Sequence, residues 1–167
     1  MHTNIIIAKD FCINIFDGTH DSPKYIPNGL PLITSKYIKN NSIDIINSPK
    51  INYKDFNNIN KRSLVKQWDI LISMIGTVGE VSLVKEIPNF AIKNIGVFRA
   101  DTLIKAKLIY YYLQSSKAKY YIKNNTTGST QQYITLTFLK KFKFEFPTDI
   151  ELQHSIVDNI RRCYFVC

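Results

Sequence analysis

Two groups of side chains in the second half of the chain are of types that bind nucleic acid. The first group consists of Lys117, Lys119 and Lys123. These lysines lie on one free face of a predicted helix, where their ammonium groups could neutralise phosphates. The second group is the polar segment 124–133, in which Gln131 or Gln132 could offer adenine a paired donor and acceptor. Each group also has a plainer interpretation, because a lysine run is often a solvated helix face and such a loop is often a connector.

The residue types that metal and disulfide chemistry require are present but are not arranged for it. The three cysteines form no CxxC pair, and the three histidines stand far apart; they are Cys12, Cys163 and Cys167, and His2, His20 and His154. We therefore expect reduced thiols and no metal site.

Catalytic motifs are also missing from the sequence. No GxxxxGK phosphate loop is present, and GTVGE at 76–80 is interpreted as a turn. Ser22-Pro23-Lys24-Tyr25 resembles the base-flipping motif of amino-methyltransferases only superficially, because lysine replaces the second proline. No Glu-x-Lys or Asp-x-Lys tripeptide that could hold magnesium occurs near residues 68–84. We expect no catalytic residue in this chain.

Length, composition and charge set the class of protein. With 167 residues, 45% of them hydrophobic, the chain fits one domain with an ordinary core. The sequence shows no membrane span and no cleavable leader, so a cytoplasmic protein is expected. The net charge of +9 favours a polyanionic partner, although lysine-rich composition can also arise from coding bias.

A β-hairpin is the clearest local pattern, and it spans residues 68–84. Trp68, Ile70 and Ile72 alternate with polar neighbours, which predicts a half-buried strand. Gly76 and Gly79 then allow a tight reversal into a second strand. Other predicted strands are a short one within 3–16 that is followed by a helical turn, and those at 32–34, 43–46, 90–100 and 142–146. Residues 17–31 are interpreted as a long loop because five glycines and prolines interrupt them.

Apolar spacings of three and four residues predict the helices. They are expected at 53–62, at 103–113 after a cap at Asp101 or Thr102, around 118–122, at 136–140, and from Asp149 to Arg162. Together these patterns predict an α/β (α+β) domain with a single mixed, mostly antiparallel sheet and packed helices.

Several short motifs, in their order along residues 10 to 160, carry a family resemblance. They are Asp17-Gly18-Thr19-His20, Pro23, Gly29-Leu30-Pro31, Asp69-Ile70-Leu71-Ile72-Ser73 with Gly76-Thr77-Val78-Gly79, Tyr111-Tyr112-Leu113, Gly128-Ser129-Thr130-Gln131, and Pro147 with Gln153, Ile156 and Val157. With them the chain resembles the target-recognition domain of specificity subunits from type I restriction-modification enzymes.

The resemblance implies a DNA reader that does no chemistry itself. It implies double-stranded DNA as ligand and, as partners, modification (methyltransferase) subunits and a restriction (helicase-nuclease) subunit. No cofactor is expected in this chain, and S-adenosylmethionine, ATP and Mg are expected in the partner subunits.

The resemblance also implies a division of the chain. Residues 1–147 would be the recognition domain and residues 148–167 the start of a spacer helix that docks the modification subunits. The residues expected on the docking face are Leu152, Ile156, Val157 and Ile160. The helix stops short of the family's long spacer, so a truncated chain or a half subunit is expected, and a half subunit could pair as a homodimer.

Two sets of side chains are expected to contact DNA under this resemblance. Phosphates would be neutralised by Lys36, Lys39, Arg99, Lys117, Lys119 and Lys123. Base preference would come from Thr19, His20, Lys36, Thr77, Ser129, Gln131 and Gln132. Two rival functions stay open: a protein-interaction module that docks through the C-terminal amphipathic helix, and an RNA-binding domain that stacks bases on its tyrosines.

Overall fold

The structure is a computed structural model that describes residues 3–147 and 149–164, without the side chains of residues 160–164. Its strands are β1 Thr3–Ile7, β2 Asn14–Asp17, β3 Tyr25–Thr34, β4 Ile38–Lys39, β5 Ser42–Ile43, β6 Lys50–Ile51, β7 Ile70–Ser73, β8 Val81–Leu83, β9 Ala91–Lys93, β10 Ile95–Arg99 and β11 Lys143–Pro147. Its helices are α1 Ala8–Phe11, α2 Tyr53–Ser63, α3 Leu103–Gln114, α4 Ser116–Asn124, α5 Leu136–Lys140 and α6 Ile150–Tyr164, with a 3₁₀ turn η1 at Ser35–Tyr37.

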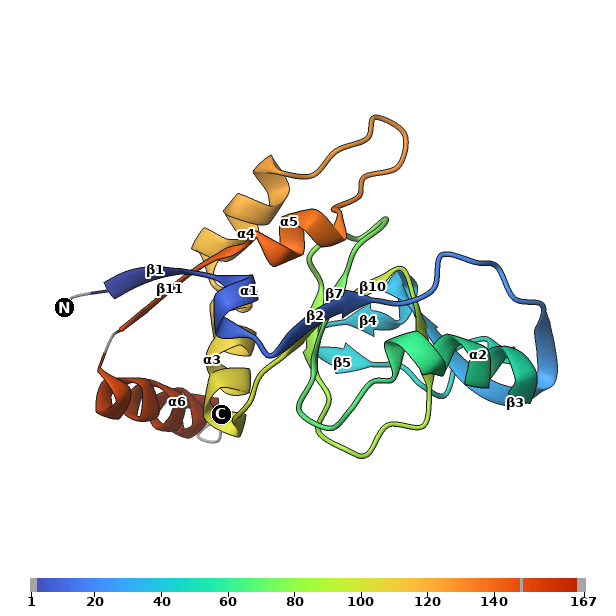
Figure 1. The fold of residues 1–167 in the computed structure, drawn as a ribbon, viewed down its shortest axis with the longest axis horizontal. Coiled ribbons are helices and arrows are strands. Elements are labelled where there is room, and N and C mark those ends of the chain that lie inside the picture. The colour runs from blue at the N-terminus through green and yellow to red at the C-terminus, as the bar shows by residue number, and fades with distance from the viewer. Residues whose placement is uncertain (1–2, 148, 165–167) are drawn as a thin grey trace.

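A four-stranded antiparallel sheet in the order β2-β10-β7-β8 lies at the centre (Figure 1). The predicted hairpin is confirmed, with Ile70 opposite Leu83 and Ile72 opposite Val81. The prediction of a half-buried strand is wrong, because all four residues of β7 are buried. Both faces of this sheet are covered. Successive side chains of β7 therefore point into two different cores, and neither set points to solvent.

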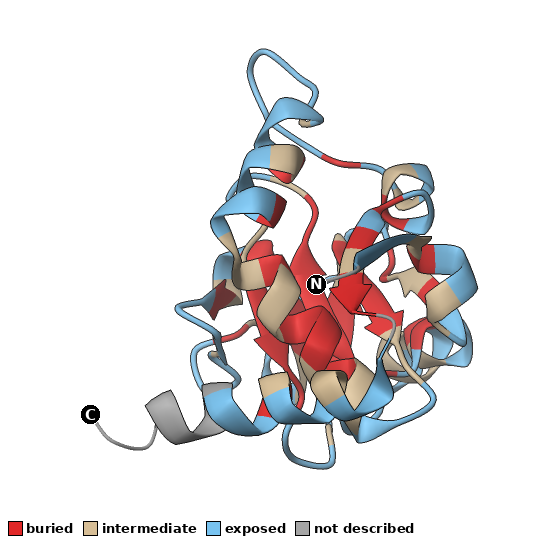
Figure 2. Cartoon of the chain, turned by 90° about the vertical axis from the view of Figure 1, so that its left-hand side faces the viewer, coloured by how far each residue is buried: buried red, intermediate tan, exposed pale blue. Residues whose placement is uncertain are grey.

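The two cores lie on opposite faces of the central sheet. The larger one holds Ile70 and Phe98 against α3, α4, α5 and β11, and the second holds Leu71 and Val97 against β3, β4 and β9. In Figure 1 the first set of helices and strands lies on one side of the sheet and α2, β3, β4 and β5 lie on the other. Figure 2 shows the buried residues gathered between these layers, with exposed residues on the outer loops and helix faces.

The α/β class with mostly antiparallel pairing is confirmed, but the strands form four small sheets and not one. Besides the central sheet there are β1-β11, β6-β3-β9 and β4-β5. The only parallel pair of strands in the described part of the chain is β3 with β9. Most strands outside the central sheet are short, and the pairing of β3 with β6 shifts register. The strands therefore do not join into one continuous sheet.

The long loop predicted at 17–31 is wrong over its second half, where β3 begins at Tyr25. This strand pairs with β6 with a shift of register between Tyr25 and Leu30. The irregular pairing accommodates Pro27, which cannot donate to a strand ladder. Proline and glycine therefore mark an irregularly paired strand here, and not a loop.

The single strand predicted at 90–100 is two strands. Asn94 interrupts them with a left-handed φ of 55°, so β9 and β10 join different sheets. The strand predicted at 43–46 is confirmed only in part, because β5 ends at Ile43.

The predicted helices are present, and side-chain oxygens cap their first turns. In each case the side-chain oxygen accepts a hydrogen bond from a backbone N–H of the first turn. The capping residues are Asn52 for α2 (2.8 Å), Thr102 for α3 (3.3 Å), Ser115 for α4 (3.2 Å) and Thr135 for α5 (3.1 Å). Such a cap typically contributes about 1 kcal/mol, because it satisfies an N–H that the helix cannot.

Helix α6 begins after Asp149, as the sequence predicts, and in the structure Asp149 Oδ1 accepts from Glu151 N at 2.8 Å. It packs on α3 and β11, and Val157 is buried in the larger core. Leu152 and Ile156 are half-buried, and the side chain of Ile160 lies outside the described residues. Thr148 is also outside them, so a domain boundary between 147 and 148 stays a prediction.

Candidate functional site

Four residues that the sequence singled out line one open pocket of about 340 Å³, here called the central pocket. They are Lys36, Lys39, Thr77 and Gln131. The other lining residues are Thr34, Ser35, Ile75, Gly76 and Asn94. Two cations thus share one pocket with hydroxyl and amide groups, although these residues are up to 95 positions apart, from 36 to 131.

The turn between β7 and β8 forms one wall of the central pocket. Gly76 has a φ of 77°, in the left-handed region that favours glycine. The Ser73 hydroxyl donates to the carbonyl oxygen of Thr77 and accepts from Glu80 N at 2.9 Å. A buried side chain therefore holds Thr77 at the pocket, while the side chain of Thr77 stays exposed.

The loop between α4 and α5 forms a second wall of the central pocket through Gln131. Thr127 and Tyr133 exchange backbone hydrogen bonds at 3.0 and 2.9 Å, which closes the loop at its base. Gly76 N donates to the carbonyl oxygen of Gln132 at 3.0 Å, so this loop and the β7–β8 turn are joined. The loop tip, with Ser129 and Gln131, is exposed.

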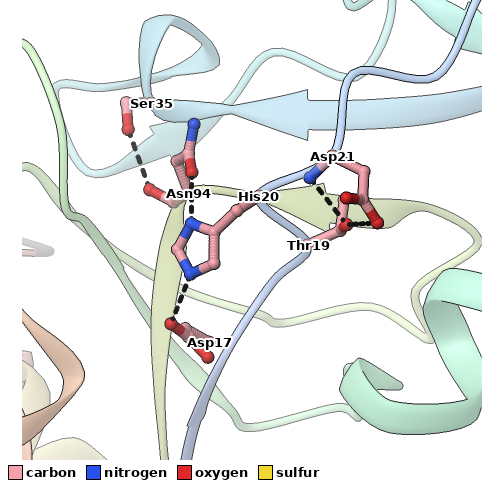
Figure 3. Close-up of polar contacts among 6 residues, drawn as sticks. All are labelled: Asp17, Thr19, His20, Asp21, Ser35 and Asn94. Carbon is pink, nitrogen blue, oxygen red and sulfur yellow. Dashed lines mark hydrogen bonds and ion pairs between the residues drawn. The ribbon is translucent and has the colours of Figure 1, made fainter.

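Asn94, which lines the central pocket, is hydrogen-bonded to three other segments of the chain, as Figure 3 shows in part. Its carbonyl oxygen accepts from Ser35 Oγ at 3.1 Å and from Met74 N at 3.2 Å, and its N–H donates to the carbonyl oxygen of Thr19 at 3.1 Å. Its side-chain Oδ1 lies 2.8 Å from Nδ1 of His20. Asn94 was not predicted from the sequence, although a polar residue inside an apolar run is a signal for a left-handed break.

His20 lies at the edge of this arrangement, with its side chain 65% exposed. Its second ring nitrogen, Nε2, lies 3.0 Å from Asp17 Oδ2 (Figure 3). Thr19 is different, because it is only 4% exposed and its hydroxyl contacts Asp21 at 3.2 Å. Of these two predicted residues, only His20 presents its side chain to the surface.

A second pocket of about 360 Å³, the α4 pocket, lies on the other side of the β7–β8 turn. Lys119, Lys123 and Gln132 line it together with Val78, Gly79, Glu80, Ile122 and Thr126. Lys117 is on the same helix but outside this pocket, and its Nζ lies 2.6 Å from Glu145 Oε2. Hydrogen bonding to Glu145 raises the pKa of Lys117, so that lysine is charged but already paired.

A third pocket of about 430 Å³, the hairpin pocket, adjoins the central pocket through Lys36 and Lys39, which line both. Its other lining residues are Tyr37, Ser42, Asp44 and Asn47. The Lys36 ammonium lies 5.8 Å from the centre of the Tyr37 ring. Hydrogen bonds from the Asn47 side chain and backbone lower the pKa of Asp44, which keeps one negative charge in this pocket.

Arg99 lies outside all three pockets. Its Nη2 lies 2.7 Å from Asp69 Oδ2 and also donates to the carbonyl oxygen of Leu64 at 2.8 Å. The guanidinium carbon lies 5.1 Å from the centre of the Phe16 ring. Nε and Nη2 of Arg99 are therefore used inside the domain.

Metal ligands and membrane-spanning helices are both absent from the described residues. No three His, Cys, Asp or Glu side chains among residues 3–147 and 149–164 gather closely enough to hold a metal ion. None of the helices in that part of the chain has the length and apolar character needed to cross a membrane.

This chain matches one protein-family model, and its fold is similar to those of several solved structures. Residues 14–164 match the family model described as "Type I restriction modification DNA specificity domain". The type I restriction-modification system S subunit from M. genitalium has a TM-score of 0.65 at 16% identity over 96% of this chain. The HsdS subunit from Thermoanaerobacter tengcongensis has a TM-score of 0.64 at 18% identity, also over 96%.

A third structural match comes from a study of complex assembly and conformational transition of the type I R-M system, with a TM-score of 0.70 at 18% identity over 97% of this chain. At these identities the likeness concerns the fold. The chain covers 38%, 38% and 37% of the three solved chains, so it spans less than two fifths of their length. No curated protein sequence matches it.

Proposed function

The chain belongs to the family of type I restriction modification DNA specificity domains, and on that premise we propose that it binds double-stranded DNA and reads one half of a split target. The observation that carries the proposal is the central pocket, which Lys36 and Lys39 line together with Thr77 and Gln131. Cations beside neutral hydrogen-bonding groups are the combination that DNA recognition needs.

Affinity comes from phosphate neutralisation. Lys36 and Lys39 serve the central and hairpin pockets, and Lys119 and Lys123 serve the α4 pocket. Each phosphate contact releases condensed counterions, so binding weakens as salt is added. Lys117 is held by Glu145 and Arg99 by Asp69. We therefore assign a smaller role to Lys117 and a scaffold role to Arg99.

Base preference comes from neutral groups on the two joined walls. Thr77, Ser129 and Gln131 are exposed there, and a glutamine can bind the N6 and N7 edge of adenine. Gln132 faces the α4 pocket with two lysines and is assigned to the phosphate backbone. The exposed His20 is assigned to a further DNA contact, and the buried Thr19 is assigned to the scaffold.

The covalent steps belong to other chains in this proposal. The modification subunits would bring S-adenosylmethionine, and the restriction subunit would bring ATP and Mg, all acting on DNA in the cytoplasm. Helix α6, with Leu152 and Ile156 half-buried and Ile160 further along, would lead toward the modification subunits. A homodimer of two such chains would read a symmetric target.

The RNA-binding alternative has less support. Its exposed tyrosines would have to share one sheet face, whereas Tyr25, Tyr53, Tyr120 and Tyr133 lie on β3, α2, α4 and a loop. The aromatic cluster around Phe142 and Phe144 lies inside the larger core and offers no stacking platform.

A salt titration tests the proposal. Duplex DNA binding by the whole chain would be measured between about 50 and 200 mM salt, for the wild type and for Lys36→Gln/Lys39→Gln. We expect the slope of log affinity against log salt to fall by about 0.9 for each phosphate that is no longer neutralised, or roughly 2 for the double variant.

The matched control is Lys54→Gln/Lys61→Gln on α2, which removes the same charge away from the three pockets. Its slope should stay close to that of the wild type. Phosphate binding at the central pocket would be refuted if the wild-type affinity did not depend on salt concentration, or if both double variants lost affinity equally.

A further inference from the structure

We propose that the tip of the β4–β5 hairpin enters the major groove and that the carboxamide of Asn40 reads an adenine there; this rests on the proposed DNA-binding function. The tip consists of Lys39, Asn40, Asn41 and Ser42, all exposed. Asn40 would be a base-reading residue that does not line the central pocket.

The hairpin has a conformation that holds its tip rigidly. Lys39 pairs with Ser42 across a two-residue turn, and Asn40 and Asn41 have φ of 50° and 62°. Two successive left-handed residues make a type I′ turn, whose twist matches that of the strands. The tip is therefore a narrow two-stranded ribbon with little freedom to lose on binding.

Both strands of the hairpin are anchored below the tip. Ile38 is fully buried and Ile43 packs against the second core. The Ser82 hydroxyl of β8 donates to the carbonyl oxygen of Asn41 at 3.2 Å. The hairpin is thus fixed to the central sheet as far as Asn41, while the residues of its tip are exposed.

The position of the tip relative to the lysines favours contact with bases. Lys39 belongs to the tip and also lines both the central and the hairpin pockets, where Lys36 is its neighbour. A phosphate backbone bound by these lysines would bring the ribbon to a groove. The major groove is about 12 Å wide and admits a two-stranded ribbon.

Asn40 is the residue of the pair that is free to read a base. Asn41 lines two pockets beside β8, with Leu83 in both and Trp68 in one, and neither Lys36 nor Lys39 lines them. No hydrogen bond holds the carboxamide of Asn40 to any part of the chain that the structure describes. Asparagine offers the donor and acceptor that match adenine N6 and N7.

Asparagine is also common at both positions of a type I′ turn for conformational reasons. The experiment must therefore separate the carboxamide of Asn40 from its role in the turn. Glycine adopts the same left-handed conformation, so Asn40→Gly removes the carboxamide and keeps the turn. Asn41→Gly is the matched control with the same backbone change. Thermal unfolding of both variants should stay within a few degrees of the wild type.

The readout is selection from duplexes that carry a randomised stretch, using the whole chain. We expect the wild type to prefer adenine at one position, and Asn40→Gly to lose about 5- to 150-fold of that preference, the equivalent of about 1–3 kcal/mol. The salt slope and the preferences at other positions should not change in Asn40→Gly, and Asn41→Gly should match the wild type.

Several results would overturn the inference. Unchanged adenine preference in Asn40→Gly, an equal decrease of that preference in Asn41→Gly, or a general decrease of affinity at all positions would each do so. In all three cases salt-dependent binding by the wild type would leave the proposed function standing. A wild-type chain that binds no duplex would instead refute the proposed function itself.

Discussion

Arg99 Nη2 lies 2.7 Å from Asp69 Oδ2, with the arginine side chain 17% exposed and the aspartate 1%. The register of β10 on β7, with Phe98 opposite Ile70, brings these two residues to the same end of the sheet. A second contact joins Arg99 Nε to Asp69 Oδ1 at 2.8 Å, so the pair is bidentate. It fixes the ends of two central strands.

Replacing Asp69 with Asn should leave Arg99 without its charge partner inside the domain. We expect the free energy of unfolding in urea to fall by about 3–5 kcal/mol, because one member of a buried pair is removed. The control is Asp101→Asn, which breaks an exposed pair with Lys105 and should cost under about 1 kcal/mol. Equal costs for the two variants would show that burial of the Arg99 pair is unimportant.

Alanine at Gly18 should destabilise the domain more than alanine at Gly96. A Cβ at Gly18 would lie 2.3 Å from the backbone oxygen of Ile92, whereas at Gly96 it would lie 2.2 Å from Leu139 Cδ1. A side-chain methyl can rotate away, so Gly96→Ala should cost about 1–3 kcal/mol and Gly18→Ala more. Chemical denaturation of both variants measures the order, and the reverse order would contradict it.

Replacing Gln131 with Ala should change which bases the chain prefers, because Gln131 lines the central pocket. Gln132→Ala is the neighbouring control, since Gln132 lines the α4 pocket with Lys119 and Lys123. We expect it to change affinity evenly across target sequences. Competition among duplexes that differ at single base pairs distinguishes the two effects. If Gln131→Ala changed affinity equally for all duplexes, Gln131 would have a structural role and would not read bases.

Cys12 should resist alkylation in the folded protein. Burial, and next the nearby Asp101 carboxylate, raise the pKa of Cys12 from 9.0 to about 12. Because the thiolate is the nucleophile, iodoacetamide at about pH 8 should label Cys12 only after denaturation. Peptide mass spectrometry measures this, and rapid labelling of Cys12 in the native chain would count against its burial.

The same pKa shift gives a pH dependence of stability. Above pH 9.0 the unfolded chain releases the Cys12 proton while the folded chain keeps it up to about pH 12. The contribution of Cys12 is therefore present below pH 9.0 and decreases as pH rises toward 12. Cys12→Ala should flatten the fall in stability over this range, as followed by urea unfolding at several pH values.

Local patterns in the sequence were enough for the elements that depend on neighbours in the chain. The hairpin at 68–84, the helices α2 to α6 and a cap at the start of α3 follow from spacing and capping chemistry, which act over a few residues. The family resemblance was carried by the sequence as well, and the family match over residues 14–164 confirms it.

Tertiary structure alone decided which polar residues have partners and which strands are buried on both faces. Nothing near Arg99 in the sequence indicates Asp69, because strand register joins residues 30 positions apart. Lys117 and Lys119 look alike in the sequence, yet only Lys117 is near a carboxylate on β11. Charge and periodicity are local properties, whereas a partner's position is fixed only when distant strands and helices pack together.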